Sequence, residues 1–216
     1  MANILTENIK KLIFRHTNFG KPKYKYNVEP VQLVELIKSI DSLSSVKKNT
    51  IVEIGVARGM TTRFLAEHIS LKNYNLDYFC IDTFSSFLDK HINYEVEKRN
   101  KIKEDLLGFT YNDYSKWKKN FQEYKFIKPI KCDCSTFDFS SIAPINLCFL
   151  DVDLYLPTIK TLNSIWNFMA EDSVIIVDDV KDKTEWDGAF QAFIEFVNDK
   201  KLNYYLIGTK CGVIKK

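Results

Sequence analysis

Four aspartates in the second half of the chain come in two pairs, and each pair follows a short apolar run. They are Asp151, Asp153, Asp178 and Asp179. The runs have the composition of buried parallel strands, which lie about 4.8 Å apart in a sheet, so the carboxylates should converge at one rim. Anions that close repel, and either the pKa of a carboxyl rises or a cation binds. Because oxygen ligands at a partly open site favour Mg²⁺, we predict a magnesium site formed by Asp151, Asp178 and Asp179.

The same rim could act on a hydroxyl group. A sugar or aliphatic hydroxyl is a poor nucleophile at neutral pH, but coordination to a divalent ion makes it more acidic, and a nearby carboxylate can accept its proton. We assign this general-base role to Asp153. An alternative stays open, in which some of the aspartates cap helices or bind the protein's own backbone.

A glycine-containing turn, Glu53–Gly59, closes an earlier apolar run and opens a helical pattern. Glycines at such a turn let the backbone bend tightly and approach a ligand closely. The spacing differs from both the turn that binds a dinucleotide pyrophosphate and the phosphate loop. An acidic residue before a wider glycine turn suits a cationic, phosphate-free nucleoside such as S-adenosylmethionine. We therefore predict that Glu53, Gly55 and Gly59 bind this cofactor.

Further acids stand at the ends of the next two predicted strands. Asp82 ends the second strand, where a carboxylate can accept hydrogen bonds from both hydroxyls of a ribose. Asp133 and Cys134 end the third strand, where an adenine would lie. Together with Asp151 they complete the predicted cofactor-binding set. The alternative, that these acids only cap the following helices, stays open.

Seven short runs rich in β-branched and aromatic residues are the candidate strands that position these side chains. They are Thr50–Ile54, Tyr78–Ile81, Phe126–Lys131, Asn146–Leu150, Val174–Val177, Asn203–Ile207 and Gly212–Lys215. Helical patterns with one apolar face lie between several of them. This alternation predicts an α/β fold, a Rossmann-like doubly wound sheet that is mostly parallel, with the last two runs forming an antiparallel hairpin.

One domain should cover residues 1–216, because no Pro/Gly-rich linker interrupts the chain. Residues 1–48 form a predicted N-terminal helical cap, whose amphipathic first helix could serve a contact between two copies. Residues 84–124 are too many for a simple crossover and form a predicted helical insertion near the acceptor site. Within it, helical spacing from Leu88 reaches a stop at Gly108, and Asn112 should cap a second helix.

Composition excludes several classes of protein. The 31 basic and 28 acidic residues give a net charge of +3, too mild to predict nucleic-acid binding. No apolar run approaches the roughly 18 residues of a membrane span, and the amino terminus has no signal-peptide core. The five cysteines have no paired spacing and suggest free thiols in a reducing compartment, so a cytoplasmic location is expected.

The sequence resembles the class I S-adenosylmethionine-dependent methyltransferases, and more narrowly the macrocin O-methyltransferase family, which methylates sugar hydroxyls of natural products. The resemblance runs from about Gln32 to Phe196. It rests on Glu53-x-Gly55-Val56-x-Arg58-Gly59, Asp82-Thr83-Phe84, Asp151-x-Asp153-x-Tyr155-x-x-Thr158, Asp178-Asp179 and Trp186-x-Gly188-x-x-x-Ala192-x-x-Glu195-Phe196. It implies Mg²⁺ at the ends of the fourth and fifth strands, matching Asp151, Asp178 and Asp179. Leu154 stands where the catechol-type enzymes carry a lysine, so a lysine base is not expected there.

The favoured function is therefore an S-adenosylmethionine-dependent, Mg²⁺-assisted O-methyltransferase that acts on a hydroxyl of a sugar or other small molecule, including a glycan. Two alternatives remain. One is a cation-dependent enzyme on the same scaffold that does not transfer methyl groups. The other is a nucleotide-binding or partner-binding module without catalysis.

Overall fold

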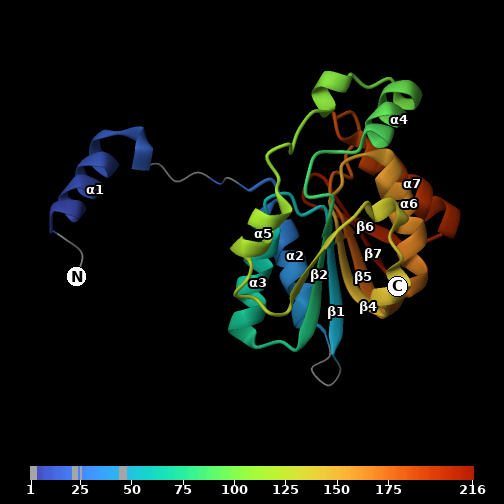
Figure 1. The fold of residues 1–216 in the computed structure, drawn as a ribbon, viewed down its shortest axis with the longest axis horizontal. Coiled ribbons are helices and arrows are strands. Elements are labelled where there is room, and N and C mark those ends of the chain that lie inside the picture. Colours follow the sequence, from blue (N-terminus) through green and yellow to red (C-terminus); the bar gives the residue numbers. More distant parts are fainter. Residues whose placement is uncertain (1–3, 21–23, 25, 44–47) are drawn as a thin grey trace.

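A mixed seven-stranded sheet forms the centre of the molecule, with strand order β3-β2-β1-β4-β5-β7-β6 (Figure 1). The computed structural model describes residues 4–20, 24, 26–43 and 48–216. The strands are β1 Asn49–Ile54, β2 Leu76–Asp82, β3 Ile127–Lys131, β4 Ile145–Leu150, β5 Met169–Val177, β6 Tyr204–Ile207 and β7 Cys211–Lys215. Strands β1 to β5 are parallel, and β7 pairs antiparallel with both β5 and β6. The predicted doubly wound sheet with a C-terminal hairpin is confirmed.

Helices cover both faces of the sheet (Figure 1). They are α2 Pro30–Asp41, α3 Met60–Lys72 and α5 Tyr114–Asn120 on one face, and α6 Tyr155–Ile165 and α7 Asp187–Lys200 on the other. Successive strand residues point to opposite faces, so Ile51 of β1 packs with α2 and α3 while Val52 packs with α6 and α7. This double burial explains why the parallel strands are apolar on both sides.

The helix α2 begins with local signals that the sequence carries. Pro30 occupies the first turn, where a missing N–H costs nothing. Glu29 and Gln32 form a capping box, in which the backbone N–H of Glu29 donates to Gln32 Oε1 at 2.5 Å. Gln32 is fully buried, so this cap also carries a polar side chain into the interior.

Two details of the insertion differ from prediction. Its first helix, α4 Asp89–Arg99, ends at Asn100, which adopts the left-handed conformation with φ of 56° and stops the helix well before Gly108. Leu106 belongs to a separate short 3-10 helix, Lys103–Leu106. The cap of α5 is Asp113 rather than Asn112, because the Asp113 side chain accepts the backbone N–H of Lys116. The α4 part of the insertion lies beyond the carboxyl ends of the parallel strands, whereas α5 packs beside α3 on one face of the sheet (Figure 1).

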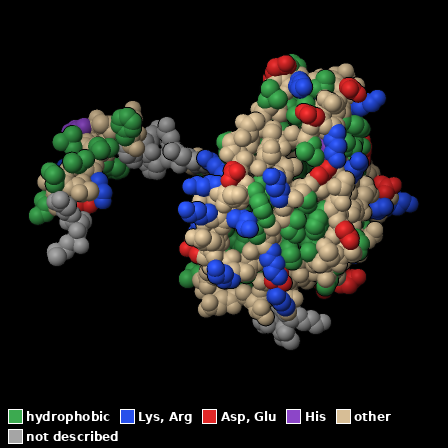
Figure 2. All heavy atoms as spheres, viewed as in Figure 1, with side chains coloured by type: hydrophobic (Ala, Val, Ile, Leu, Met, Phe, Trp, Pro, Cys, Tyr) green, Lys and Arg blue, Asp and Glu red, His purple; other side chains and the backbone are tan. Residues whose placement is uncertain are grey.

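The first helix, α1 Ile4–His16, lies apart from the sheet, and none of its residues is buried (Figure 1). Apolar side chains cover much of its visible surface in Figure 2. The two parts of the predicted N-terminal cap therefore differ, because α2 packs against the sheet and α1 does not. None of the helices in the described part of the chain is long and apolar enough to cross a bilayer.

Candidate active site

The glycine turn passes directly against the end of β4. Gly55 has φ of +84°, and a Cβ added there would lie 1.7 Å from the backbone oxygen of Asp151. Gly59 has φ of +85°, and its added Cβ would meet the Phe121 ring at 2.5 Å. Both positions therefore require glycine, for conformation as well as for space. Gly55 lines two cavities, whereas Gly59 lines neither of them and packs beneath the turn.

Asp82, at the end of β2, holds this turn in shape. One carboxylate oxygen accepts the backbone N–H groups of Val56 at 2.8 Å and Ala57 at 3.1 Å, and the other accepts that of Phe84 at 2.6 Å. Burial raises the pKa of Asp82, although these three hydrogen bonds oppose the rise. The Thr83 hydroxyl also lies 3.4 Å from Asp82, but its single proton has a shorter acceptor in the Ser86 carbonyl at 3.1 Å. Of the about four acceptor positions of the carboxylate, one therefore stays open toward the cavity that Asp82 lines.

Glu53 lies under the turn and is 1% exposed. Its carboxylate accepts the hydroxyl of Thr62 at 2.8 Å and the hydroxyl of Tyr78. Burial raises the pKa of Glu53 to about 7, despite both hydrogen bonds, which favour the charged form. The side chain thus faces the interior and borders the smaller of the two cavities, of about 370 Å³.

The raised pKa of Glu53 predicts a stability that depends on pH. The folded protein holds a proton that the unfolded chain releases near pH 4.5, so folding becomes less favourable as the pH rises from about 4.5 to 7. A shift of that size corresponds to about 3 kcal/mol. The Glu53→Gln variant keeps a neutral acceptor for Thr62 and Tyr78 and should lose this dependence. Urea unfolding of both proteins at pH 5 and pH 8 measures this dependence. If the free energy of unfolding changes between the two pH values as much in the variant as in the wild-type protein, Glu53 is not its source.

Asp133 and Cys134 follow β3 and line the larger cavity, as Asp82 does. Asp133 accepts the backbone N–H of Ser135 at 2.9 Å and pairs with Lys90 at 2.5 Å. Burial raises the pKa of the Cys134 thiol to about 12, so the thiol is neutral. His91 from α4 lies 3.7 Å from Asp133, and burial lowers the pKa of His91 to about 4, so it too is neutral at pH 7.

The four aspartates after β4 and β5 do converge, but in a different grouping from the predicted one. Carboxylate oxygens of Asp151, Asp153 and Asp179, all half-buried, lie within 4.8 Å of one another. Asp153 and Asp179 adopt left-handed φ values of 60° and 55°. Aspartate tolerates this conformation better than most residues, at a cost of about 1 kcal/mol or more. The two strained turns help to bring these carboxylates together.

Asp178 instead faces the interior and is 2% exposed. Its two oxygens accept from Gln32 Nε2 at 2.6 Å and from Lys210 Nζ at 2.8 Å. Lys210 also donates to Asp179 at 2.8 Å. Sequence reasoning missed both partners of Asp178. The available signal was a lysine in the turn of the predicted hairpin, but nothing local placed that turn beside β5.

Electrostatics in the cluster are dominated by burial. Burial, and then the charge of Asp178, raises the pKa of Asp151 well above its usual range. Burial, and then the charge of Asp179, does the same for Asp153. The pKa of Lys210 rises above its usual value because the attraction of Asp178 and Asp179 exceeds the effect of its burial. Burial and mutual repulsion therefore favour the protonated forms of Asp151 and Asp153.

One cavity of about 520 Å³ brings most of these residues together. Its volume is typical of a small-molecule site. The predicted site residues that line it are Gly55, Asp82, Asp133, Cys134, Asp151, Asp153, Asp178 and Asp179. Phe87, Leu88 and Phe109 of the insertion also line it, and Trp186 faces it from the loop before α7. The smaller cavity adjoins it, because Gly55, Ala57 and Asp151 line both.

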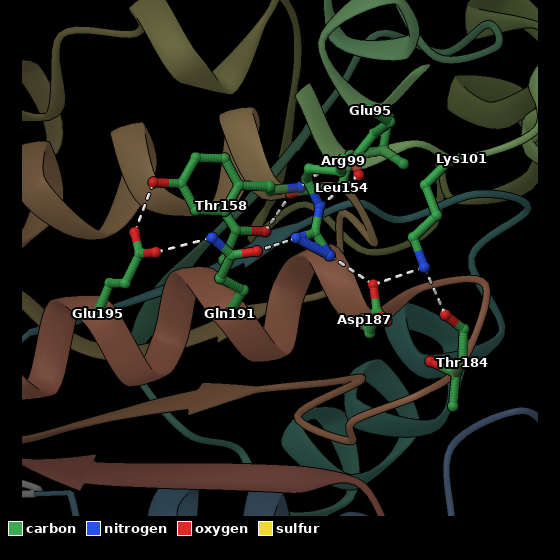
Figure 3. Close-up of polar contacts among 10 residues, drawn as sticks. Glu95, Arg99, Lys101, Leu154, Thr158, Thr184, Asp187, Gln191 and Glu195 are labelled. Carbon is green, nitrogen blue, oxygen red and sulfur yellow. Dashed lines mark hydrogen bonds and ion pairs between the residues drawn. The ribbon is translucent and has the colours of Figure 1, made fainter. Parts of the chain in front are cut away.

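A buried polar network ties the insertion to α6 and α7 (Figure 3). The carboxylate of Glu95, on α4, accepts Arg99 Nε at 2.7 Å and the backbone N–H of Tyr155 at 2.6 Å. Arg99 also binds Asp187 and Gln191 on α7, and Lys101 lies 2.7 Å from Asp187. Because Tyr155 begins α6, the network also holds the loop that carries Asp153.

Comparison with known proteins identifies the family of this chain. A family model described as a methyltransferase domain matches residues 52–180, which include the glycine turn, Asp82 and all four aspartates. No curated protein sequence is significantly similar to this chain. Because the match is to the broader family, the resemblance to macrocin O-methyltransferases stays a prediction.

Solved structures with a similar fold include methyltransferases of different specificity. The calicheamicin methyltransferase CalS11 has a TM-score of 0.66 and 14% identity, covering 100% of this chain and 94% of its own. The O-methyltransferase NovP has a TM-score of 0.66 and 14% identity, covering 86% and 79%. The N-methyltransferase NodS from Bradyrhizobium japonicum has a TM-score of 0.53 and 15% identity, covering 85% and 90%. At these identities the likeness establishes the fold and not the acceptor. On the extent of its family match, this chain belongs to the methyltransferase-domain family.

Proposed function

We propose that this protein is an S-adenosylmethionine-dependent, Mg²⁺-assisted O-methyltransferase acting on a hydroxyl group of a sugar or another small molecule. One observation carries the proposal: the carboxylates of Asp151, Asp153 and Asp179 meet in the same cavity that Gly55 and Asp82 line. A cofactor and an acceptor bound in that cavity would lie next to the acids.

The residues at the turn suit the cofactor. S-adenosylmethionine supplies a methyl group on a sulfonium. Asp82 would accept a hydrogen bond from a ribose hydroxyl with the one acceptor position that its other contacts leave open. Gly55 would let the backbone lie against the nucleoside, while Asp133 and Cys134 would border the adenine. Glu53 borders the smaller cavity, where its carboxylate would face the cationic end of the cofactor.

The acidic cluster suits a divalent ion such as Mg²⁺, because its donors are three half-buried carboxylates within reach of one another. Asp151, Asp153 and Asp179 would hold the ion, with Asp153 taking the place that the sequence predicts for Asp178. The ion would supply positive charge that lowers the pKa of an acceptor hydroxyl. Asp153 would accept the hydroxyl proton through the carboxylate oxygen that does not face the ion. Alignment of the hydroxyl with the methyl group would supply much of the remaining acceleration.

The acceptor would bind between the cluster and the insertion. The Phe87 ring contacts Phe109 edge to face, with ring centroids 5.3 Å apart, and Trp186 in a tilted arrangement, with centroids 5.7 Å apart. All three rings border the cavity. Such rings pack well against the apolar face of a sugar or against an aromatic acceptor. In this proposal residues 84–124 shape the acceptor site, and Asn27, from the segment before α2, borders it and lines both cavities.

Calorimetric titration with S-adenosylhomocysteine tests cofactor binding without any acceptor. We expect binding by the wild-type protein, and binding by Asp82→Asn that is weaker by about tenfold or more, because one charged hydrogen bond contributes about 1.5–3 kcal/mol. The matched control is Asp77→Asn on the same strand, whose carboxylate pairs with Lys48 and Lys128 away from the cavity. If titration of the wild-type protein gives no heat signal, the proposal is overturned.

Methyl transfer then tests the metal. TDP-rhamnose, the acceptor named for CalS11, is the first sugar nucleotide to try. Transfer from labelled S-adenosylmethionine should stop in EDTA and return with Mg²⁺, whereas binding of S-adenosylhomocysteine should not change. If an Asp179→Ala variant stays fully active with EDTA present, the metal role is wrong.

A further inference from the structure

Lys210 reaches the acidic rim from the turn between β6 and β7. Its Nζ lies 2.8 Å from a carboxylate oxygen of Asp178 and 2.8 Å from one of Asp179, and its side chain is only 20% exposed. In the described part of the chain, no other lysine or arginine forms an ion pair with the aspartates that follow β4 and β5. The cluster therefore already contains one permanent positive charge.

The position of this lysine is held by the surrounding structure. The backbone N–H of Val180 donates to the Lys210 carbonyl at 2.7 Å, which ties the turn to the residues after Asp179. The neighbouring Thr209 donates to Glu29 from its backbone N–H at 2.8 Å and from its hydroxyl at 2.6 Å. Glu29 is the N-cap of α2, so the hairpin turn is braced on two sides. Such bracing distinguishes Lys210 from a solvated surface lysine.

The pairing also decides which carboxylates face a metal ion. Asp178 has one oxygen on Lys210 and the other on Gln32, so each of its oxygens already has a donor. Asp179 is shared, because it contacts Lys210 and also belongs to the group of three close carboxylates. An ammonium group this close repels a divalent ion bound to Asp179.

We propose that Lys210 is the resident counter-ion of the acidic cluster, which keeps Asp178 from ligating a divalent ion and weakens the binding of that ion to Asp151, Asp153 and Asp179. The inference rests on the proposed function for the presence of the ion site. It adds that the affinity of the site for its ion is set by a residue from the hairpin. It also explains how four converging carboxylates are partly neutralised before any ion binds.

Titration with Mn²⁺, followed by the electron paramagnetic resonance signal of the free ion, measures this affinity without cofactor or acceptor. The Lys210→Met variant should bind Mn²⁺ about tenfold tighter or more, because a repulsive charge is removed and Asp178 becomes available. The matched control is Lys181→Met, an exposed lysine next to Val180 that forms no ion pair with the described residues, and its affinity should stay within about twofold of wild type.

A Lys210→Gln variant also removes the charge but keeps a polar group for Asp178. It serves as the second neutral variant in case the methionine variant does not fold. Thermal unfolding establishes that each variant is folded. Equal or weaker Mn²⁺ binding by the folded neutral variants overturns the inference, as does a lack of binding by every protein. Because the titration needs no cofactor, failure here is distinct from failure to bind S-adenosylhomocysteine, which would overturn the proposed methyltransferase activity instead.

Discussion

Replacing Asp153 with asparagine is expected to lower the rate of methyl transfer about 10²- to 10⁴-fold, the usual contribution of a general base. The amide cannot accept a proton from the acceptor, whereas its size and shape match the carboxylate. Asparagine also tolerates the left-handed backbone at this position, where φ is 60°, so the fold should survive. The measurement is the single-turnover rate at saturating Mg²⁺, with the acceptor that the wild-type protein methylates.

The control for this variant is Asp172→Asn. Asp172 also has φ of 60°, but it is exposed in the first half of β5 and does not line the cavity. It should leave the rate unchanged within about twofold, as is usual for surface substitutions. Affinity for S-adenosylhomocysteine should be similar in all three proteins. If Asp153→Asn keeps more than about a tenth of the wild-type rate, the proton is taken elsewhere.

The second large effect should follow from Arg99→Met. The substitution leaves the buried Glu95 carboxylate, which is 1% exposed, without its charged partner. It also removes the ion pair between residue 99 and Asp187. Breaking a buried ion pair from one side costs about 3–5 kcal/mol, because an uncompensated charge remains in the interior. We expect a loss of that size in the free energy of unfolding, measured by urea denaturation at pH 7.

Lys98→Met is the matched control, since it removes the same charge one residue earlier on an exposed face of α4. Its effect should stay within about 0.5 kcal/mol. A loss below about 1 kcal/mol for Arg99→Met would mean that solvent screens the pair and that the network in Figure 3 does not hold the insertion. A wild-type affinity for S-adenosylhomocysteine in the folded variant would show that the network acts on the insertion and not on the glycine turn.

Local pattern was sufficient for the elements of the sheet. Most of β1 and β4, and Val174–Val177 of β5, are apolar on both faces because helices cover both sides of the sheet. That double burial is visible in the sequence as short apolar runs. The ends of helices were less predictable. Asn100 stops α4 through a left-handed conformation that glycine or asparagine adopts easily, but apolar spacing continued past it to Leu106.

The sequence alone determined that several of the predicted residues lie at one edge of the sheet. Gly55, Asp82 and the four aspartates follow apolar runs, and in a parallel sheet the carboxyl ends of all strands lie at the same rim. Their presence near one cavity therefore needed only the strand assignment.

Tertiary structure decided which contacts each of the four aspartates makes. Asp178 binds Gln32, 146 residues earlier, and Lys210, 32 residues later, because α2 packs on this face and β7 lies next to β5. The left-handed backbone at Asp153 and Asp179 brings the remaining carboxylates together with Asp151. Side-chain direction and charge pairing depend on contacts between segments far apart in the chain, and no local periodicity records those contacts.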